Sequence, residues 1–182
     1  MKTALLMIDI QNDYFEGGTM TLSGSGIAAR NAGKILERFR TTGLPVVHIQ
    51  HIATKADATF FLPGTWGAEI HPYVTPLEQE QVIIKHFPNS FRETGLHEYL
   101  QSMGITDLVI CGMMTHMCVD ATTRAAKDAG YTCTVIGDAC ATRDLELNGM
   151  NVESEHVQMS FLAALAYFYS TVVSANQYLN AI

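Results

Sequence analysis

Three residues in this sequence carry side chains suited to acid–base or nucleophilic chemistry, and each follows an apolar stretch. Asp9 and Lys85 come directly after such stretches, and Cys118 follows another one after a break at Gly112. Continuous apolar runs of this kind are typical of strands buried on both faces, as in a parallel sheet. Ligands of parallel sheets bind at the carboxyl ends of the strands. We therefore expect the three side chains at one edge of a sheet.

Cys118 falls in the first turn or so of a predicted helix. Small residues recur at four-residue spacing from Ala121 to Ala129, and Gly130 ends the pattern. The free N–H groups and the dipole at a helix start would lower the pKa of a thiol and could hold a developing oxyanion. A single cysteine in a helix is more often a packing residue. The position by itself leaves both interpretations open.

The elements that must position these residues alternate along the chain. The predicted strands are Ala4–Asp9, Pro45–His51, Gln81–Lys85, Asp107–Cys111, Tyr131–Ile136 and Thr171–Val173. The predicted helices are Ile27–Thr42, a helix capped by Thr94 that runs to Ser102, the helix that carries Cys118, and Val152–Tyr169. Residues 138–142 are expected to be a polar loop at the end of the fifth strand. Strands that alternate with helices predict an α/β fold in which helices cover both sides of a parallel sheet.

The connection from Ala56 to Pro76 is long and aromatic, and it contains the single tryptophan, Trp66. Connections of this length in compact domains are usually functional or disordered, and the aromatic content argues against disorder. We expect either a lid or pocket wall, or a contact with another subunit.

Composition limits the class of protein. The 182 residues are 48% hydrophobic, which predicts one globular domain over residues 1–182. The net charge of −7 and the lack of Lys/Arg clusters argue against nucleic acid and anionic membranes as partners. No stretch is apolar for long enough to span a bilayer, and four cysteines without CxxC spacing indicate a reduced, cytoplasmic protein. The low charged fraction and the alanine-rich last helix predict a homo-oligomer, a dimer or a tetramer.

Two histidines on the second predicted strand resemble a metal pair, but their spacing argues against one. His48 and His51 are three residues apart, so their side chains point to opposite faces of a strand. We expect His48 to be a sheet-face residue and His51, at the end of the strand, to line the site. The Gly24-Ser-Gly26 segment lacks both the dinucleotide and the P-loop pattern, so no nucleotide cofactor is predicted.

The segment around Cys118 resembles the nucleophile segment of the isochorismatase-like cysteine hydrolases, a family that includes nicotinamidases, N-carbamoyl-amino-acid amidohydrolases and isochorismatase. The matching residues are Gly112, Thr115, Cys118, Val119, Thr122, Arg124, Ala126, Gly130 and Tyr131. Ile10–Phe15 resembles the opening motif of the family, Lys85–Phe91 its Lys-x-x-x-Ser-x-Phe motif, and Pro63–Ile70 its isochorismatase and carbamoyl-hydrolase members. The resemblance implies a Rossmann-like, three-layer α-β-α fold with a six-stranded, mostly parallel sheet.

The resemblance also implies roles for single residues. Asp9 would be the general base, Cys118 the nucleophile and Lys85 the group that stabilises both when they are ionised. The backbone N–H groups of Met114 and Cys118 would form an oxyanion hole, and the peptide bond before Met114 would be cis. The residues expected to contact the substrate are Gln11, Phe15, His51, Trp66 and Phe91.

The predicted reaction is hydrolysis of a small amide, ureido or related C–N bond through a thioester. Several zinc-binding members of the family carry Asp-x-His where this chain has His51-Ile-Ala53, so we expect neither a metal nor another cofactor. The same departure puts nicotinamidase activity in doubt. Two alternatives stay open, namely isochorismatase-type vinyl-ether hydrolysis and a binding protein that keeps a vestigial site.

Overall fold

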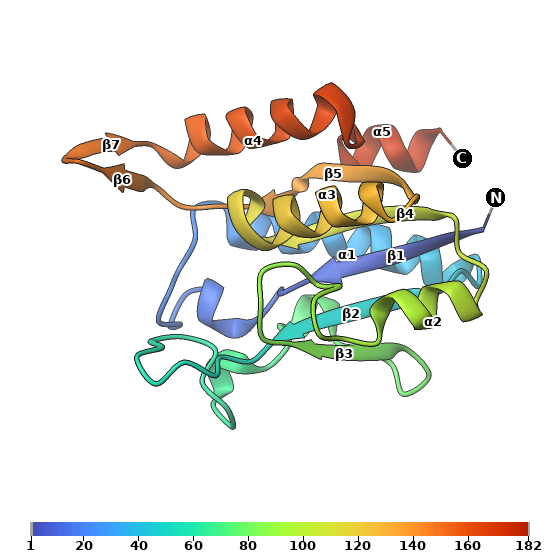
Figure 1. The fold of residues 1–182 in the computed structure, drawn as a ribbon, viewed down its shortest axis with the longest axis horizontal. Helices are drawn as coiled ribbons and strands as arrows, with labels where there is room; N and C mark the ends of the chain where they lie inside the picture. The colour runs from blue at the N-terminus through green and yellow to red at the C-terminus, as the bar shows by residue number, and fades with distance from the viewer. Residues whose placement is uncertain (1, 182) are drawn as a thin grey trace.

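A computed structural model describes residues 2–181 and places six strands in one sheet between two layers of helices (Figure 1). The strand order is β3-β2-β1-β4-β5-β8, and every neighbouring pair is parallel. The strands are β1 (Thr3–Ile8), β2 (Val46–His51), β3 (Gln81–Lys85), β4 (Asp107–Met113), β5 (Thr132–Ala141) and β8 (Thr171–Val173). All six therefore end at the same edge of the sheet, which carries the candidate site.

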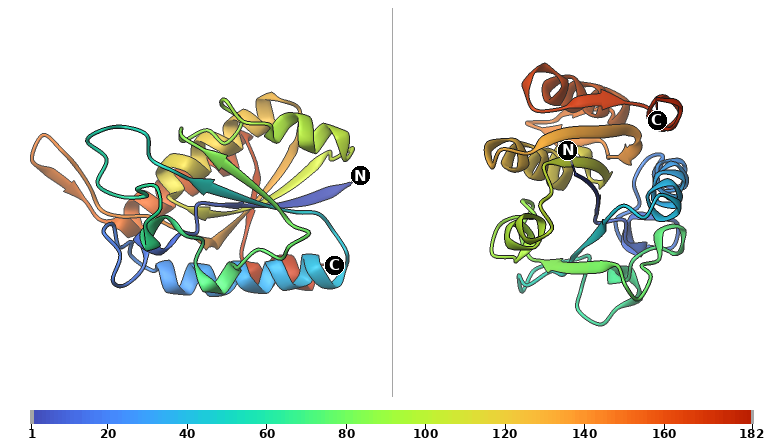
Figure 2. Two further views of the ribbon diagram at one scale, coloured as in Figure 1. Left: turned by 90° about the horizontal axis from the view of Figure 1, so that it is seen from below. Right: turned by 90° about the vertical axis from the view of Figure 1, so that its right-hand side faces the viewer.

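The helices form the outer layers, as Figure 2 shows. One face of the sheet is covered by α1 (Ser25–Thr41) and α5 (Ala175–Asn180), and the other by α2 (Leu96–Ser102), α3 (Asp120–Asp128) and α4 (Ser154–Phe168). Successive side chains of a strand point to opposite faces. Leu5 of β1 accordingly joins the core cluster under α1, and Leu6 the cluster under α2 and α3. The predicted three-layer α/β fold is confirmed.

The prediction of a polar loop at residues 138–142 is wrong. β5 continues to Ala141, because a register shift between Ile110 and Gly112 of β4 lets Gly112 and Met113 pair with Cys140 and Ala141. An irregularity of this kind interrupts the hydrophobic alternation, so the sequence pattern does not reveal that the strand continues beyond it.

The N-terminus of α2 also differs from the prediction. Gly95, and not Thr94, is the N-cap residue, while the Thr94 hydroxyl accepts a hydrogen bond from the N–H of Leu96 at 3.4 Å.

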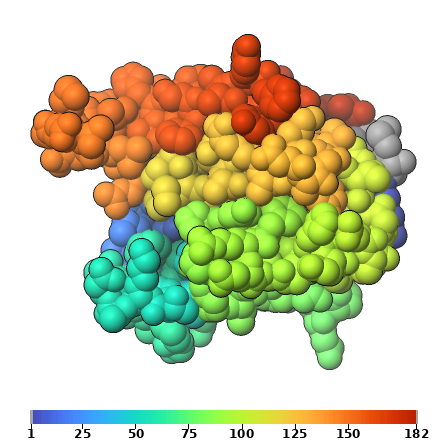
Figure 3. Space-filling model, viewed as in Figure 1, coloured from blue at the N-terminus to red at the C-terminus, as the bar shows by residue number. Residues whose placement is uncertain are grey.

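Three further elements were not expected from the sequence. A hairpin of β6 (Leu145–Leu147) and β7 (Met150–Val152) precedes α4, and α5 follows β8 with a Ser174 capping box. The hairpin projects from the body of the molecule (Figures 1 and 3) and exposes Leu147 and Met150. These elements are too short for hydrophobic periodicity to reveal them.

Helix α4 is apolar but covers the sheet with few of its side chains. Only Val157 and Leu165 are buried, whereas Met159, Tyr167 and Phe168 are exposed. Within residues 2–181 no helix combines the length and the apolar character needed to cross a membrane.

Gly112 allows β1 and β4 to approach closely beside the site. Its φ is +139°, and a Cβ at this position would lie 2.0 Å from the carbonyl oxygen of Ile8. Any side chain would push β4 away from β1, the strand that leads to Asp9. The glycine at the break of the predicted strand is therefore a requirement of packing as well as of backbone conformation.

Candidate active site

Asp9 is the first residue after β1 and lies at the centre of the sheet edge. Its backbone has a φ of +50°, which is uncommon for a residue other than glycine, and its side chain is fully buried. Strained conformations of this kind persist where the surrounding structure enforces them and are frequent at functional sites. One carboxylate oxygen, Oδ2, lies 2.8 Å from Nζ of Lys85. The other, Oδ1, has no hydrogen-bond donor among residues 2–181.

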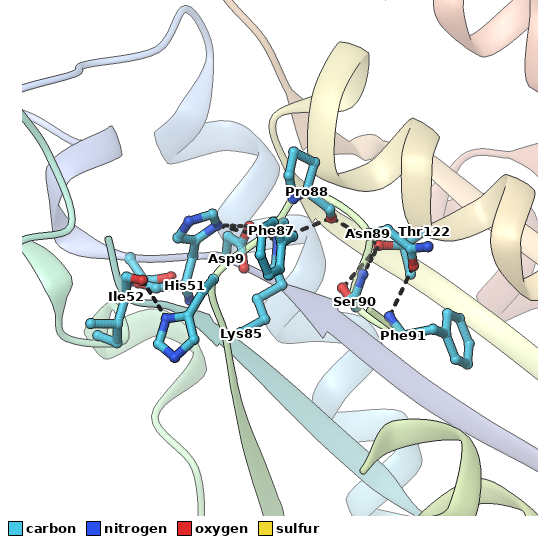
Figure 4. A network of polar contacts seen from close by, with 12 residues as sticks. Asp9, His51, Ile52, Lys85, Phe87, Pro88, Asn89, Ser90, Phe91 and Thr122 are labelled. Atoms are coloured by element: carbon cyan, nitrogen blue, oxygen red, sulfur yellow. Dashed lines mark hydrogen bonds and ion pairs between the residues drawn. The ribbon is translucent and has the colours of Figure 1, made fainter. Parts of the chain in front are cut away.

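Lys85 is the last residue of β3 and is also fully buried. Its ammonium group donates to the carbonyl oxygens of Phe87 and Pro88, both at 3.1 Å, in addition to its ion pair with Asp9 (Figure 4). Burial acts to lower the pKa of Lys85, but the charges of Asp9 and Cys118 outweigh it, so the pKa is raised. The buried lysine is therefore held in its charged form.

Cys118 lies in a π-helical turn, Thr115–Val119, between β4 and α3. Its Sγ, a carboxylate oxygen of Asp9 and a ring nitrogen of His51 all lie within 4.8 Å of one another. The structure thus gathers Asp9, Lys85 and Cys118 at one point, as the sequence predicts.

The expected lowering of the thiol pKa is wrong. Burial raises the pKa of Cys118, the negative charge of Asp9 raises it further, and Lys85 only partly opposes them. The thiol lies within a dense core instead of at a solvated helix end, so the desolvation of the thiolate outweighs the helix dipole. The resting side chain is a thiol, and its activation requires a base.

The peptide bond between Met113 and Met114 is cis, as predicted. Met114 precedes the π-helical turn, and its carbonyl oxygen accepts hydrogen bonds from the N–H groups of Met117 and Val119. Met114 is the N-cap residue of this turn and Cys118 its fourth residue, and amides in the first turn of a helix have no preceding helical turn to bind.

Ser90 and Thr122 were not predicted as site residues, yet they connect the lysine segment to the helix behind Cys118. Both are fully buried, and the Thr122 hydroxyl accepts from the N–H of Ser90 at 3.0 Å and contacts its hydroxyl at 2.8 Å (Figure 4). Ser90 belongs to the Lys85–Phe91 motif and Thr122 to the segment around Cys118, and the resemblance of these two motifs to the family was the signal that could have identified both residues. They fix the distance between the segment after β3 and α3.

We expect Thr122→Val to lower the free energy of unfolding by about 1–3 kcal/mol, because it leaves the buried N–H of Ser90 without its acceptor. Chemical denaturation measures this change. Thr123→Val is the matched control, since its hydroxyl binds only the carbonyl oxygen of Val119 within the helix. An equal loss in both variants would contradict the assigned role.

His51 and Gln11 contact each other beside the triad of Asp9, Lys85 and Cys118. The buried amide of Gln11 accepts from the N–H of His51 at 2.7 Å and donates to the His51 carbonyl at 2.9 Å and the Ala68 carbonyl at 2.7 Å. Gln11, expected to contact the substrate, instead spends its hydrogen bonds on the backbone. His48, in contrast, points away and contacts Glu80 at 3.0 Å, as its spacing from His51 predicts.

The three aromatic residues expected at the substrate lie in different places. Phe15 is buried and stacks on His71, with ring centroids 3.7 Å apart, and Trp66 is 55% exposed. Phe91 is not brought to the site, because its ring stacks on Tyr131 at the opposite end of β5. These rings lie in or beside loops and short 3-10 turns, which have no periodic buried face, so sequence spacing could not determine where the rings point.

A cavity of about 580 Å³ opens beside the triad. Its walls are residues 53–55 and 57–61 together with His51, His86, Phe87, Pro88 and Arg92. The triad itself does not line the cavity, and His51 connects the two, because one of its ring nitrogens lies within 4.8 Å of Asp9 and Cys118. In Figure 3 the segment of residues 53–61 (teal) lies next to the segment of residues 86–92 (green). The first part of the aromatic connection is therefore a pocket wall, and the volume suits a small molecule.

Asp13 holds this wall and was not predicted to do so. Its buried carboxylate accepts from the N–H of Phe61 at 2.6 Å and from the N–H and hydroxyl of Thr19. Phe61 is fully buried with a φ of +56°, so the carboxylate fixes a strained residue of the wall. The signal was its place in the opening motif Ile10–Phe15.

The donor set formed by Asp9, His51 and Cys118 does not suit a metal ion. The ammonium group of Lys85 lies 2.8 Å from Oδ2 of Asp9 and 3.4 Å from Nδ1 of His51, so a permanent positive charge already occupies the space among these atoms. A second cation would be repelled, and the burial of Lys85 leaves it no way out of the site.

We therefore expect turnover to survive exhaustive chelation. Activity is to be measured before and after dialysis against EDTA, with metal content determined on the same samples. Added zinc is expected to give no gain. A loss on chelation that zinc restores would show that a metal displaces the Lys85 ammonium.

Comparisons with known proteins identify the family of this chain. A family model described as the isochorismatase domain matches residues 3–176. The chain belongs to the isochorismatase family. The uncharacterized isochorismatase family protein YddQ of Bacillus subtilis is 53% identical over 98% of this chain and 99% of its own.

Two solved structures extend the comparison within the isochorismatase family. A structure of the isochorismatase hydrolase type from Oleispira antarctica is 50% identical, with a TM-score of 0.94 over 98% of this chain and 96% of the other. N-carbamoylsarcosine amidase from Thermoplasma acidophilum is 26% identical, with a TM-score of 0.83 over 96% and 97%.

Proposed function

We propose that this isochorismatase-family chain is a cysteine-dependent hydrolase of a small amide, ureido or related C–N substrate. The observation that carries the proposal is the convergence of Asp9, Lys85 and Cys118 at the carboxyl edge of the sheet, beside a cavity of small-molecule size. The similarity to N-carbamoylsarcosine amidase supports the C–N class.

In the proposed first step, Asp9 takes the proton of the Cys118 thiol while Sγ attacks the carbonyl carbon of the substrate. The free oxygen Oδ1 of Asp9 suits this role, since its partner oxygen is already held by Lys85. The carbonyl oxygen becomes negative, and the N–H groups of Met114 and Cys118 would stabilise it.

The second half of the cycle reverses these transfers. The proton on Asp9 moves to the leaving nitrogen, the C–N bond breaks, and an amine or ammonia departs from a thioester on Cys118. Asp9 then takes a proton from water, the hydroxyl adds to the thioester carbon, and Sγ leaves with the proton. Lys85 keeps a positive charge beside both ionisable groups throughout, which favours the ionised forms that each step needs.

A substrate panel with an independent trap for the intermediate tests the proposal. Small primary amides, N-carbamoyl amino acids, nicotinamide and isochorismate are to be incubated with the protein, and ammonia, amine or pyruvate measured. Rapid acid quench followed by peptide mass spectrometry is expected to find an acyl or carbamoyl group on Cys118. Turnover of isochorismate alone, with no adduct on Cys118, would favour vinyl-ether hydrolysis. No turnover and no adduct with any compound would favour a vestigial site.

The raised pKa of Cys118 gives a pH prediction. Alkylating reagents react with the thiolate, so the rate of iodoacetamide labelling of Cys118 is expected to rise about tenfold per pH unit between pH 7 and 9. Asp9→Asn removes a charge that raises this pKa and leaves Lys85, which lowers it. The variant is therefore expected to label faster at pH 7 although it loses turnover. Peptide mapping of Cys133 and Cys140 provides the internal control.

We also propose that α4 packs against a second copy of this chain. The apolar side chains of Met159, Tyr167 and Phe168 would then be covered, as the composition leads us to expect. Light scattering is expected to find a dimer or tetramer, and Tyr167→Glu with Phe168→Glu is expected to reduce it to a monomer. A wild-type chain that is monomeric at micromolar concentration would contradict this.

A further inference from the structure

His51 is fixed beside the triad at both its backbone and its ring. The side-chain amide of Gln11 binds the N–H and the carbonyl oxygen of His51, and Gln11 itself is fully buried. These hydrogen bonds hold the backbone of His51, and the 3.4 Å contact between its Nδ1 and Nζ of Lys85 positions the ring. A side chain held in this way is preorganised for a contact with a ligand.

The contacts of Nδ1 determine which nitrogen carries the proton. Nδ1 lies 3.4 Å from Nζ of Lys85, whose three protons already have acceptors in Asp9, Phe87 and Pro88. A proton on Nδ1 would face this ammonium group and be repelled by it, so Nδ1 carries its lone pair. The competing arrangement, in which an N–H at Nδ1 donates to Asp9, requires a contact that measures 3.9 Å and is too long. In Figure 4 one ring nitrogen of His51 faces Asp9 and Lys85.

The charged groups around the ring keep it neutral. Burial lowers the pKa of His51; the carboxylate of Asp9 opposes this, while the positive charges of Lys85 and His86 add to it. A neutral imidazole with a lone pair on Nδ1 carries its proton on Nε2. The side chain of His51 is 18% exposed and lines the 580 Å³ cavity, so the nitrogen turned away from Lys85 faces the space for a substrate.

We propose that His51 is a neutral hydrogen-bond donor that binds the substrate through Nε2–H. The inference rests on the proposed function and narrows its substrate class. A substrate of this site carries an acceptor atom, such as a carbonyl oxygen or a ring nitrogen, next to the bond that is broken. Because Sγ of Cys118 lies within 4.8 Å of the ring, the same molecule can meet both groups.

The first test needs no substrate. Nitrogen-15 spectra of the histidine rings at pH 7, with the His51 signals assigned by their loss in His51→Gln, report the tautomer directly. The expected result is a neutral ring protonated on Nε2. A ring protonated on Nδ1, or on both nitrogens, would overturn the proposal.

The second test measures donation to an acceptor. Iodoacetamide carries a carbonyl group next to its reactive carbon and methyl iodide does not, so the ratio of their alkylation rates at Cys118 isolates the hydrogen bond from changes in thiol reactivity. His51→Leu is expected to lower this ratio about tenfold, the effect of losing one hydrogen bond to a neutral partner. His51→Gln, whose amide can place a donor near Nε2, is expected to keep most of it.

His86→Leu is the matched control, because His86 also lines the cavity but its Nδ1 contacts the carbonyl oxygen of Ile52 at 2.8 Å. Its ratio should match that of the wild type. An unchanged ratio in His51→Leu, or an equal fall in His51→Leu and His51→Gln, would overturn the donor role. Both tests are independent of turnover, so a failed substrate panel beside a donating His51 would refute the reaction and not the binding role.

Discussion

Cys118→Ala is expected to abolish turnover, with a loss of kcat/KM of at least about a thousandfold, as is usual when a nucleophile is removed. Without Sγ no thioester can form. Asp9 does not replace Cys118 as the nucleophile, because it acts as the base. The fold should be kept, since the substitution removes one buried sulfur atom and leaves the ion pair of Asp9 with Lys85 in place. Steady-state kinetics on the substrate that the panel identifies measures the loss.

Cys140→Ala is the matched control for this experiment. Like Cys118, Cys140 is buried in the core cluster under α2 and α3. It lies on β5, and its Sγ donates to the carbonyl oxygen of Ile136. Its alanine variant is expected to keep turnover within a fewfold of the wild type. Full activity in Cys118→Ala would remove the thioester mechanism and leave vinyl-ether hydrolysis as the reaction of this site.

Lys85→Met is expected to lower the free energy of unfolding by about 3–5 kcal/mol, because it leaves a buried carboxylate without its counter-charge. Both Lys85 and Asp9 are 0% exposed, and Nζ of Lys85 lies 2.8 Å from Oδ2 of Asp9. Turnover should also be lost, since the positive charge no longer supports the ionised forms of Asp9 and Cys118. Urea denaturation and steady-state kinetics measure the two effects separately.

The double variant Asp9→Asn with Lys85→Met separates structure from chemistry. It removes both charges, so much of the lost stability is expected to return while turnover stays absent. Arg40→Met provides a control at a partly buried ion pair, where Glu80 keeps a hydrogen bond from the N–H of Leu77. If Lys85→Met were no less stable than Arg40→Met, the buried pair would have no structural importance.

Much of the fold could be predicted because its strands carry apolar runs. Residues 4–8 form such a run in a central strand that is buried on both faces, whereas the run 82–84 lies in the edge strand β3, which exposes Val82 and Ile84. The residue after each run falls at the carboxyl edge by the geometry of a parallel sheet. The meeting of Asp9 and Lys85 with Cys118 follows from that geometry together with the family motifs. The register shift in β4 and the short hairpin before α4 have no such signal.

The chemistry of single groups could not be predicted as well as their positions. The sequence places Cys118 near a helix start, which favours a thiolate, but the pKa depends on how completely neighbouring segments exclude water. The same holds for Gln11, whose amide is taken up by the backbone of His51, and for Phe91, which turns to Tyr131. Burial and partner choice are properties of the assembled molecule.

The cavity wall and the reacting groups come from different parts of the chain. Asp9, Lys85 and Cys118 follow strands of the sheet, while most of the wall is the connection of residues 53–61, which is held at Phe61 by Asp13. Between the fixed ends at Ala53 and Phe61, residues 54–59 are mostly exposed and can change in sequence and length without moving the triad. Substrate range can therefore diverge by mutation of one surface loop at little cost in stability, and grafting that loop between relatives offers a direct route to new specificities.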